Sequence, residues 1–332
     1  MQEIANKGAG ALVSKTISVE PAEVPRPNLA KIGESLINAE KWSEIPLSQW
    51  VKEELPKAKE AGLPLIASIG YSASDVEEIA PQVAEAGVDA LEISPNYEAD
   101  DPESIVEVIE AAKSETDLPV FVKLSADMLN IADFAEAAEE AGADGIVAID
   151  AVGPALRIDV YTENPIMGSE NGYGNLSGPA IKPIAVRCVA DIARAVDIPV
   201  IGVGGIKDEK DVAEFLMAGA SAVQICTTAI TRGSKIFGLI ADSLSGFMNG
   251  RGYDSIDEIS GSALNNLPDE PIRTSAKQPD VLQSKCTGCG LCVKHCSYDA
   301  VKIVGGSARI DPANCSGCGL CVSVCPPEAI RF

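Results

Sequence analysis

The sequence predicts an α/β chain, namely a (β/α)8 TIM barrel followed by a small cysteine-rich α+β domain. Two observations predict the barrel. Short apolar runs alternate with amphipathic helical stretches, and these runs are of two kinds that take turns along the chain. One observation predicts the second domain: eight of the ten cysteines lie between residues 286 and 325. At 332 residues the chain is long enough for one large domain and one small one.

Seven expected strands alternate between runs that follow a glycine and runs that begin at a proline. The glycine-led runs are 8–14, 87–93, 142–149 and 219–225, and the proline-led runs are 63–68, 118–123 and 198–204. The helices between them have recognisable starts. Ser74 with Glu77 predicts a capping box, and Asp101, Asn130 and Asp208 each precede an apolar face of helical period. This order predicts a parallel sheet with a helix after each strand.

A barrel with this alternation would begin with a proline-led strand ahead of residue 1. Residues 2–7 instead predict the first helix, so we expect the first strand to be absent from the chain. Seven strands would leave an unpaired edge, which proteins normally cover. Two explanations stay open: the sequence is a shortened form of a longer chain, or a second chain completes the barrel.

Charge and hydropathy narrow the classes of partner. The chain has 26 basic and 49 acidic residues, a net charge of -23, which argues against nucleic acid and anionic membranes as partners. No apolar run approaches the ~20 residues of a membrane span, and we find no signal segment. Cysteines concentrated in this way indicate a reducing compartment, so we expect a cytoplasmic protein.

The cysteine-rich stretch contains the pattern C-x2-C-x2-C-x3-C twice, and glycines beside the cysteines allow tight turns. In the two-cluster ferredoxin arrangement, the fourth cysteine of each run ligates the other cluster. We therefore expect one [4Fe-4S] cluster on Cys286, Cys289, Cys292 and Cys325, and a second on Cys315, Cys318, Cys321 and Cys296. Structural zinc and disulfides are the alternatives, although zinc usually takes two pairs of ligands. A ferredoxin domain at 285–332 would carry electrons.

Several stretches of the first part of the chain carry a family resemblance. They are 12–18, 94–96, 120–125, 175–183 and 202–206. On these stretches, residues 8–265 resemble the dihydroorotate dehydrogenase family. This family of FMN barrels includes the C-terminal part of dihydropyrimidine dehydrogenase, which also ends in a two-cluster ferredoxin domain. A polar, proline-bearing stretch at 265–284 predicts a linker between a barrel at 1–264 and the ferredoxin domain.

The resemblance implies that FMN binds at the mouth of the barrel. Lys123, at the end of a buried strand, is costly to leave unpaired, and the matching lysine of the family holds the N1/O2 edge of the flavin. Lys15 would reach the flavin or the substrate in the same way. For Lys123 the alternative is a lysine that extends past the rim into solvent.

The phosphate of FMN would lie after the last two strands, where barrels bind phosphate with backbone N–H groups. Gly204-Gly205 and Cys226-Thr227 occupy these positions. Ser177 and Gly178 belong to a glycine-rich segment, 168–178, that we expect to cover the cofactor. The alternatives are simple loop turns at the first two places and a mobile surface loop at the third.

Ser94 is the candidate acid/base, together with Asn96 and Lys123 as the predicted catalytic set. In the family this position carries a cysteine or serine that moves a proton while the flavin moves a hydride. A serine needs a polarising neighbour to do so. The alternative is a serine at a strand end with no catalytic part.

Three departures from the family concern the substrate and the phosphate. Asp150 stands where the pyrimidine enzymes have an asparagine that contacts the ring, and it would repel the carboxylate of orotate. Leu91, three residues before Ser94, stands where the family has another asparagine. Cys226 replaces a usual glycine beside the phosphate. We therefore expect a small-molecule substrate other than orotate or uracil.

These observations predict an iron–sulfur flavoprotein oxidoreductase acting on a CH–CH substrate, with electrons passing between two [4Fe-4S] clusters and FMN. The alternatives are an electron-transfer subunit whose barrel is a docking scaffold, and a barrel that binds another phosphorylated ligand. We find no Gly-x-Gly-x-x-Gly after a strand, so contact with NAD(P)H would need another subunit. We expect a redox partner subunit or ferredoxin, and an oligomer.

Overall fold

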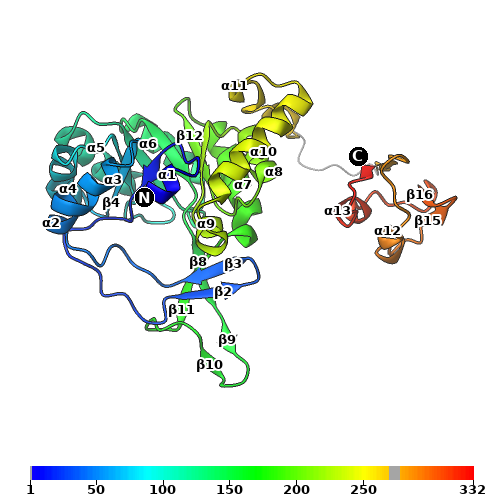
Figure 1. Cartoon of the computed structure of the whole chain (residues 1–332), viewed down its shortest axis with the longest axis horizontal. Coiled ribbons are helices and arrows are strands. Elements are labelled where there is room, and N and C mark those ends of the chain that lie inside the picture. The colour runs from blue at the N-terminus through cyan, green and yellow to red at the C-terminus, as the bar shows by residue number, and fades with distance from the viewer. Residues whose placement is uncertain (1, 269–276) are drawn as a thin grey trace. The chain divides into compact units, whose positions relative to one another are not determined.

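The computed structural model describes residues 2–268 and 277–332, and Figure 1 shows the chain. It divides into two compact units, Met1–Leu267 and Pro268–Phe332. Part of the predicted linker, residues 269–276, lies outside the described residues.

A parallel seven-stranded sheet forms the first unit, with strand order β1-β4-β5-β6-β7-β12-β13. The strands are β1 (Leu12–Val13), β4 (Leu65–Ile69), β5 (Ala90–Ile93), β6 (Val120–Leu124), β7 (Gly145–Ala148), β12 (Val200–Val203) and β13 (Ala222–Gln224). Each predicted run overlaps one of them, which confirms the TIM-like fold. Within the described residues, the edge strands β1 and β13 do not pair with each other.

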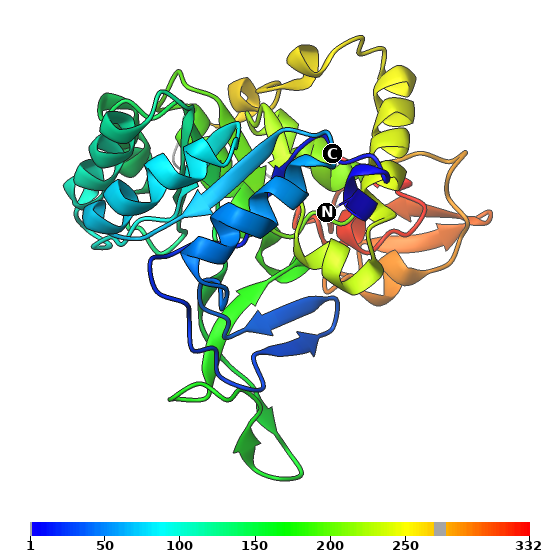
Figure 2. The same ribbon diagram turned by 60° about the vertical axis from the view of Figure 1, so that its left-hand side comes forward.

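Helices follow the strands and lie outside them, as Figure 2 shows. They are α1 (Gln2–Ala5), α2 (Leu47–Gln49), η1 (Trp50–Glu54), α3 (Leu55–Lys59), α4 (Ala73–Glu85), η2 (Pro102–Ile105), α5 (Val106–Glu115), α6 (Ile131–Glu140), η3 (Pro179–Ile181), α7 (Lys182–Ala193), α8 (Glu209–Met217), α9 (Thr227–Arg232), α10 (Ile236–Arg251), α11 (Ile256–Ile259) and η4 (Leu264–Asn266). Helix α4 begins two residues earlier than predicted, because Ser72 and Asp75 form its capping box in place of Ser74 and Glu77.

The core lies between the sheet and the helices. Phe134 of α6 and Phe215 of α8 are among its largest fully buried side chains. Burial of such apolar surface stabilises the unit by about 25 cal/mol per Å². A buried charged side chain interrupts the apolar interior of the sheet, since Glu92 of β5 is only 1% exposed.

A second, four-stranded antiparallel sheet was not predicted. Its order is β2-β3-β11-β8, with β2 (Leu29–Ile32), β3 (Ser35–Asn38), β11 (Tyr173–Ser177) and β8 (Val152–Leu156). Beyond it a short arm of β9 (Ile158–Asp159) and β10 (Asn164–Pro165) extends away from the seven-stranded sheet (Figure 1). The glycine-rich segment thus contains a strand that pairs on both sides, which contradicts the alternative of a mobile surface loop.

The second unit is a small α+β domain. Strands β14 (Asp280–Val281) and β17 (Ile330–Arg331) pair, as do β15 (Val301–Val304) and β16 (Ser307–Ile310), with short helices α12 (Leu291–Lys294) and α13 (Leu320–Ser323). Its core consists of Cys292, Val301, Ala308 and Ile330. Across the described residues of both units, we find no helix with the length and apolar character that spanning a membrane requires.

Candidate active site

Lys123 lies inside the curled sheet and forms a salt bridge there. Its Nζ is 2.9 Å from Oε1 of Glu92 on the neighbouring strand, and its side chain is only 19% exposed. Gln224 of β13 donates a second hydrogen bond, of 2.7 Å, to Oε2 of the same carboxylate. The lysine is therefore paired within the sheet. Sequence reasoning missed both partners, although an acidic residue inside the run Leu91–Ile93 was a usable signal.

The charges around Lys123 keep it an ammonium. Burial by itself would lower the pKa of Lys123, but the charges of Glu92 and Asp150 and the hydrogen bond that Lys123 donates to Glu92 outweigh it. The pKa of Lys123 is therefore raised above its ordinary value. A fixed positive charge is thus available at this end of the sheet.

Asp150 lies directly after Ile149 at the end of β7 and accepts a 2.7 Å hydrogen bond from the N–H of Ala151. Its charge reaches several neighbours. Burial first, and then Asp150, raise the pKa of Tyr71, and burial and Asp150 together also raise the pKa of Asp127. Asp150 therefore makes this end of the sheet unfavourable for a further negative charge.

Cys226, which follows β13, is accessible to solvent but surrounded by enough protein for desolvation to raise the pKa of its thiol. The positive charge of Lys123 opposes this rise, while Glu40 and Asp150 add to it. The net effect keeps the thiol protonated. Cys226 thus lies in the same electrostatic neighbourhood as Lys123 and Asp150.

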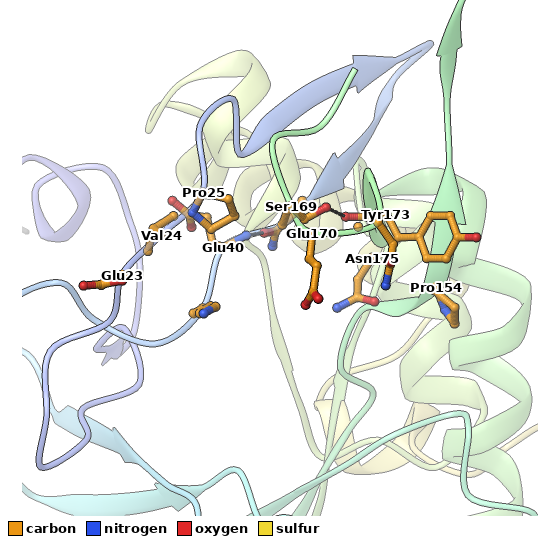
Figure 3. Close-up of a pocket in the computed structure, with 14 residues that line it drawn as sticks. Glu23, Val24, Pro25, Glu40, Pro154, Ser169, Glu170, Tyr173 and Asn175 are labelled. Carbon is orange, nitrogen blue, oxygen red and sulfur yellow. Dashed lines mark hydrogen bonds between the residues drawn. The ribbon is translucent and has the colours of Figure 1, made fainter. Parts of the chain in front are cut away.

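Lys15 follows β1, and its Nζ lies 3.6 Å from Oε2 of Glu40. Glu40 also lines a polar cavity of about 580 Å³ together with Glu170 and Asn175, as Figure 3 shows. Lys15 therefore stands between the end of the sheet and this cavity, which β3 and β11 border.

The predicted phosphate residues meet in close backbone contact. The Thr227 hydroxyl donates a 2.9 Å hydrogen bond to the Ser177 hydroxyl. A Cβ on Gly205 would lie 2.7 Å from the carbonyl oxygen of Gly178, and a Cβ on Gly178 would lie 2.8 Å from Cγ2 of Thr227. Within the described residues, the backbone N–H groups of Gly204 and Gly205 have no protein acceptor. This arrangement suits an anionic oxygen ligand.

Ser94 lies after β5, as predicted, and is partly exposed. Its N–H donates to the carbonyl of Ile69, at 3.0 Å, and the N–H of the exposed Asn96 donates to Tyr71, also at 3.0 Å. No described residue hydrogen-bonds to the Ser94 hydroxyl. The structure places Ser94 one strand away from Lys123 without giving it a polarising neighbour.

The cluster cysteines line two separate cavities in the second unit. One is lined by Cys286, Cys289, Cys292 and Cys325, and the other by Cys296, Cys315, Cys318 and Cys321. These are the two sets that crossed ligation predicts. All ten cysteines are free of disulfides. No three metal-ligating side chains in the described part of the chain lie close enough to share a single ion.

Comparison with known proteins identifies the family. Residues 1–248 match the dihydroorotate dehydrogenase family model, and residues 272–332 match a 4Fe-4S dicluster domain. This chain belongs to the dihydroorotate dehydrogenase family. Membership and the dicluster domain together support an oxidoreductase acting on CH–CH groups, with flavin and iron–sulfur clusters as cofactors.

Curated relatives within the family carry the name dihydroorotate dehydrogenase B (NAD(+)), catalytic subunit. The protein from Methanothermobacter thermautotrophicus is 40% identical over 79% of this chain and 89% of its own length. The protein from Pyrococcus abyssi is 40% identical over 78% of this chain and 88% of its own length. The protein from Thermoplasma volcanium is 38% identical over 80% of this chain and 89% of its own length.

Proposed function

We propose that this chain is the catalytic unit of an iron–sulfur flavoprotein oxidoreductase. The second unit would hold two [4Fe-4S] clusters and the first unit would hold FMN, cofactors that would supply electron transfer between them and hydride transfer with an organic substrate. The observation that carries the proposal is the set of contacts at the ends of β6, β11, β12 and β13, which brings a buried ammonium and a glycine-lined backbone turn into one site.

FMN fits these residues by charge and shape. Lys123 would hold the N1/O2 edge of the ring, where negative charge gathers on reduction. Gly204, Gly205, Ser177, Gly178 and Thr227 would hold the phosphate. When bound, the flavin supplies the two-electron chemistry, and the protein supplies position and electrostatics. Lys15 and Cys226 would line the same cofactor.

Within the second unit, each four-cysteine cavity would hold one cluster. Backbone N–H groups already point at two of the sulfurs: Ala308 donates to Sγ of Cys286 and Ala329 to Sγ of Cys325, both at 3.3 Å. Such hydrogen bonds stabilise the thiolate that a cluster requires. The name of the relatives, a catalytic subunit, supports the further proposal that a redox partner exchanges electrons with these clusters.

The test is to release the small molecules by acid from anaerobically purified protein and to quantify FMN and iron per chain. We expect about one FMN and about eight irons, as two cubanes require. About eight irons without flavin would overturn the flavoenzyme proposal and favour an electron-transfer subunit whose barrel serves as a docking scaffold.

The substrate is predicted to lack a carboxylate beside the ring, because an acidic residue, Asp150, lies directly after β7, where it would repel that carboxylate. We expect purified protein to turn over dihydroorotate poorly, and Asp150→Asn to lower its KM about tenfold, the effect of ~1.4 kcal/mol. Steady-state rates with an artificial electron acceptor measure both. Robust turnover of dihydroorotate by the unaltered chain would contradict the role given to Asp150.

Ser94→Ala should slow the reduction of the flavin by substrate about 10²-fold, since Ser94 is the proposed proton carrier. Reduction of the same flavin through the clusters should be unchanged, because it does not use this proton transfer. Stopped-flow absorbance follows both rates. Equal loss of the two rates would show that the substitution disturbs the flavin and not the proton.

A further inference from the structure

Glu92 is a buried charge that the proposed reaction has so far not used. Among the described residues only Glu92 and Asp211 are buried charged side chains. Asp211 joins a partly exposed network with Lys182 and Glu214 on the outer helices. Glu92 instead lies inside the sheet at 1% exposure, where an unpaired carboxylate would be very costly.

Two donors satisfy this carboxylate. Lys123 reaches Oε1 from the adjacent strand β6, at 2.9 Å, and Gln224 reaches Oε2 from β13, at 2.7 Å. Strands β5 and β13 are not neighbours in the sheet, so the second bond crosses its curled interior. Gln224 stands two residues before Cys226. The carboxylate of Glu92 therefore contacts both Lys123 and the strand that leads to the predicted phosphate residues Cys226 and Thr227.

We propose that Glu92 is a positioning residue that lowers the reduction potential of the bound flavin through Lys123. The inference rests on the proposed function, in which Lys123 holds the N1/O2 edge. Reduction adds two electrons and one proton to the flavin and leaves a negative charge at that edge. An ammonium that already shares its charge with Glu92 stabilises this negative charge less than a free ammonium would.

The charges facing Lys123 make the effect of Glu92 on the flavin potential depend on pH in a way that can be measured. They come from Glu92 on β5 and Asp150 after β7, whereas the Cys226 thiol after β13 faces Lys123 as a protonated, neutral group. Glu92 is the strongest of those that raise the pKa of Lys123, against the lowering by burial. In Glu92→Gln the pKa of Lys123 should therefore fall. Below that pKa the lysine is a free ammonium, and above it the positive charge is lost.

The experiment measures the flavin midpoint potential of FMN-loaded protein by anaerobic equilibrium titration against reference dyes, from pH 6 to pH 9. At low pH, E92Q should bind reduced FMN about tenfold more tightly relative to oxidised FMN, a rise of about 30 mV. As the pH rises through the lowered pKa of Lys123, the potential should fall back. No such extra pH dependence is expected in the unaltered chain over this range.

Gln224→Met is the matched control, since it removes the other hydrogen bond to Glu92 and leaves the charges in place. Its potential should stay near that of the unaltered chain even if its Tm falls. If E92Q and Q224M lower Tm alike and neither changes the potential, Glu92 only ties the strands together and the inference is wrong.

A second comparison tests the path of the effect. In the Lys123→Met background, adding E92Q should leave the potential unchanged, because the lysine that transmits the effect is gone. A change there would overturn the role of Lys123. If E92Q does not fold, Glu92→Asp keeps the charge but withdraws it by one methylene, and should shift the potential the same way by less.

The outcomes also separate this inference from the proposed function. If the unaltered chain binds FMN and E92Q has the same flavin potential as the unaltered chain, the inference alone is wrong. Unaltered chain that cannot be loaded with FMN overturns both.

Discussion

Lys123→Met is expected to lower the free energy of unfolding by about 3–5 kcal/mol, because it leaves the carboxylate of Glu92 buried and without its charged partner. Glu92 is 1% exposed, so water cannot replace the ammonium. Urea unfolding of flavin-free protein, followed by far-UV circular dichroism, measures the loss. The double variant K123M/E92Q should regain most of it, since neither side chain is then charged. Equal stability of K123M and the unaltered chain would show that the buried pair is energetically neutral.

The two variants should agree, however, in their effect on the flavin. Both lack the ammonium that would hold the N1/O2 edge, so both should bind FMN more weakly and lose it on gel filtration, although an excess of FMN should still load them for potential titrations. Their iron content should stay that of the unaltered chain, because the eight cysteines between residues 286 and 325 belong to a separate compact unit. Recovery of stability without recovery of flavin would separate the structural role of Lys123 from its role at the cofactor.

Crossed ligation gives an equally large expected effect on iron content. Cys286 and Cys325 line one cavity, so the double variant Cys286→Ser/Cys325→Ser should lose a single cluster and keep about four irons. Cys286 and Cys296 line different cavities, so Cys286→Ser/Cys296→Ser should lose both clusters and keep almost no iron. Iron and acid-labile sulfide per chain provide the measurement.

The reverse result would show that each cluster takes four cysteines that follow one another in the chain. The two double variants remove the same number of thiols and share Cys286, so each is the matched control for the other. A general loss of stability would therefore lower the iron content of both and could not produce the expected difference.

The strands of the seven-stranded sheet were predictable because each has a local mark, a preceding glycine or a leading proline. The four-stranded sheet has no such mark. Leu29–Ile32 alternates only weakly in burial, and the pairing of β3 with β11 joins Asn38 to Asn175. A contact across so much chain leaves no periodic signal in either segment. The start of α4 was misplaced for a simpler reason, since Ser72 and Ser74 both suit a cap.

The parts of the candidate site that depend on a single residue or motif could be predicted from the sequence. The parts that depend on contacts between distant residues could not. A lysine closing an apolar strand is conspicuous, and so are paired glycines after a strand. Glu92 was overlooked because both faces of a parallel strand are buried, so alternation does not show which face a side chain takes. Gln224 is 132 residues away from it, and only the curl of the sheet brings the two together.

The four-stranded sheet and its arm have a consequence for how such proteins diversify. The chain leaves the barrel at Asp150 and returns at Gly178, and the pairing of β8 with β11 closes the base of this excursion. At its far end Val160 and Tyr161 are 79% and 94% exposed. Insertions or deletions at the exposed tip, residues 160–163, can therefore accumulate without moving either stem. Descendants of one ancestor can thus acquire different outer surfaces while inheriting the same reaction centre.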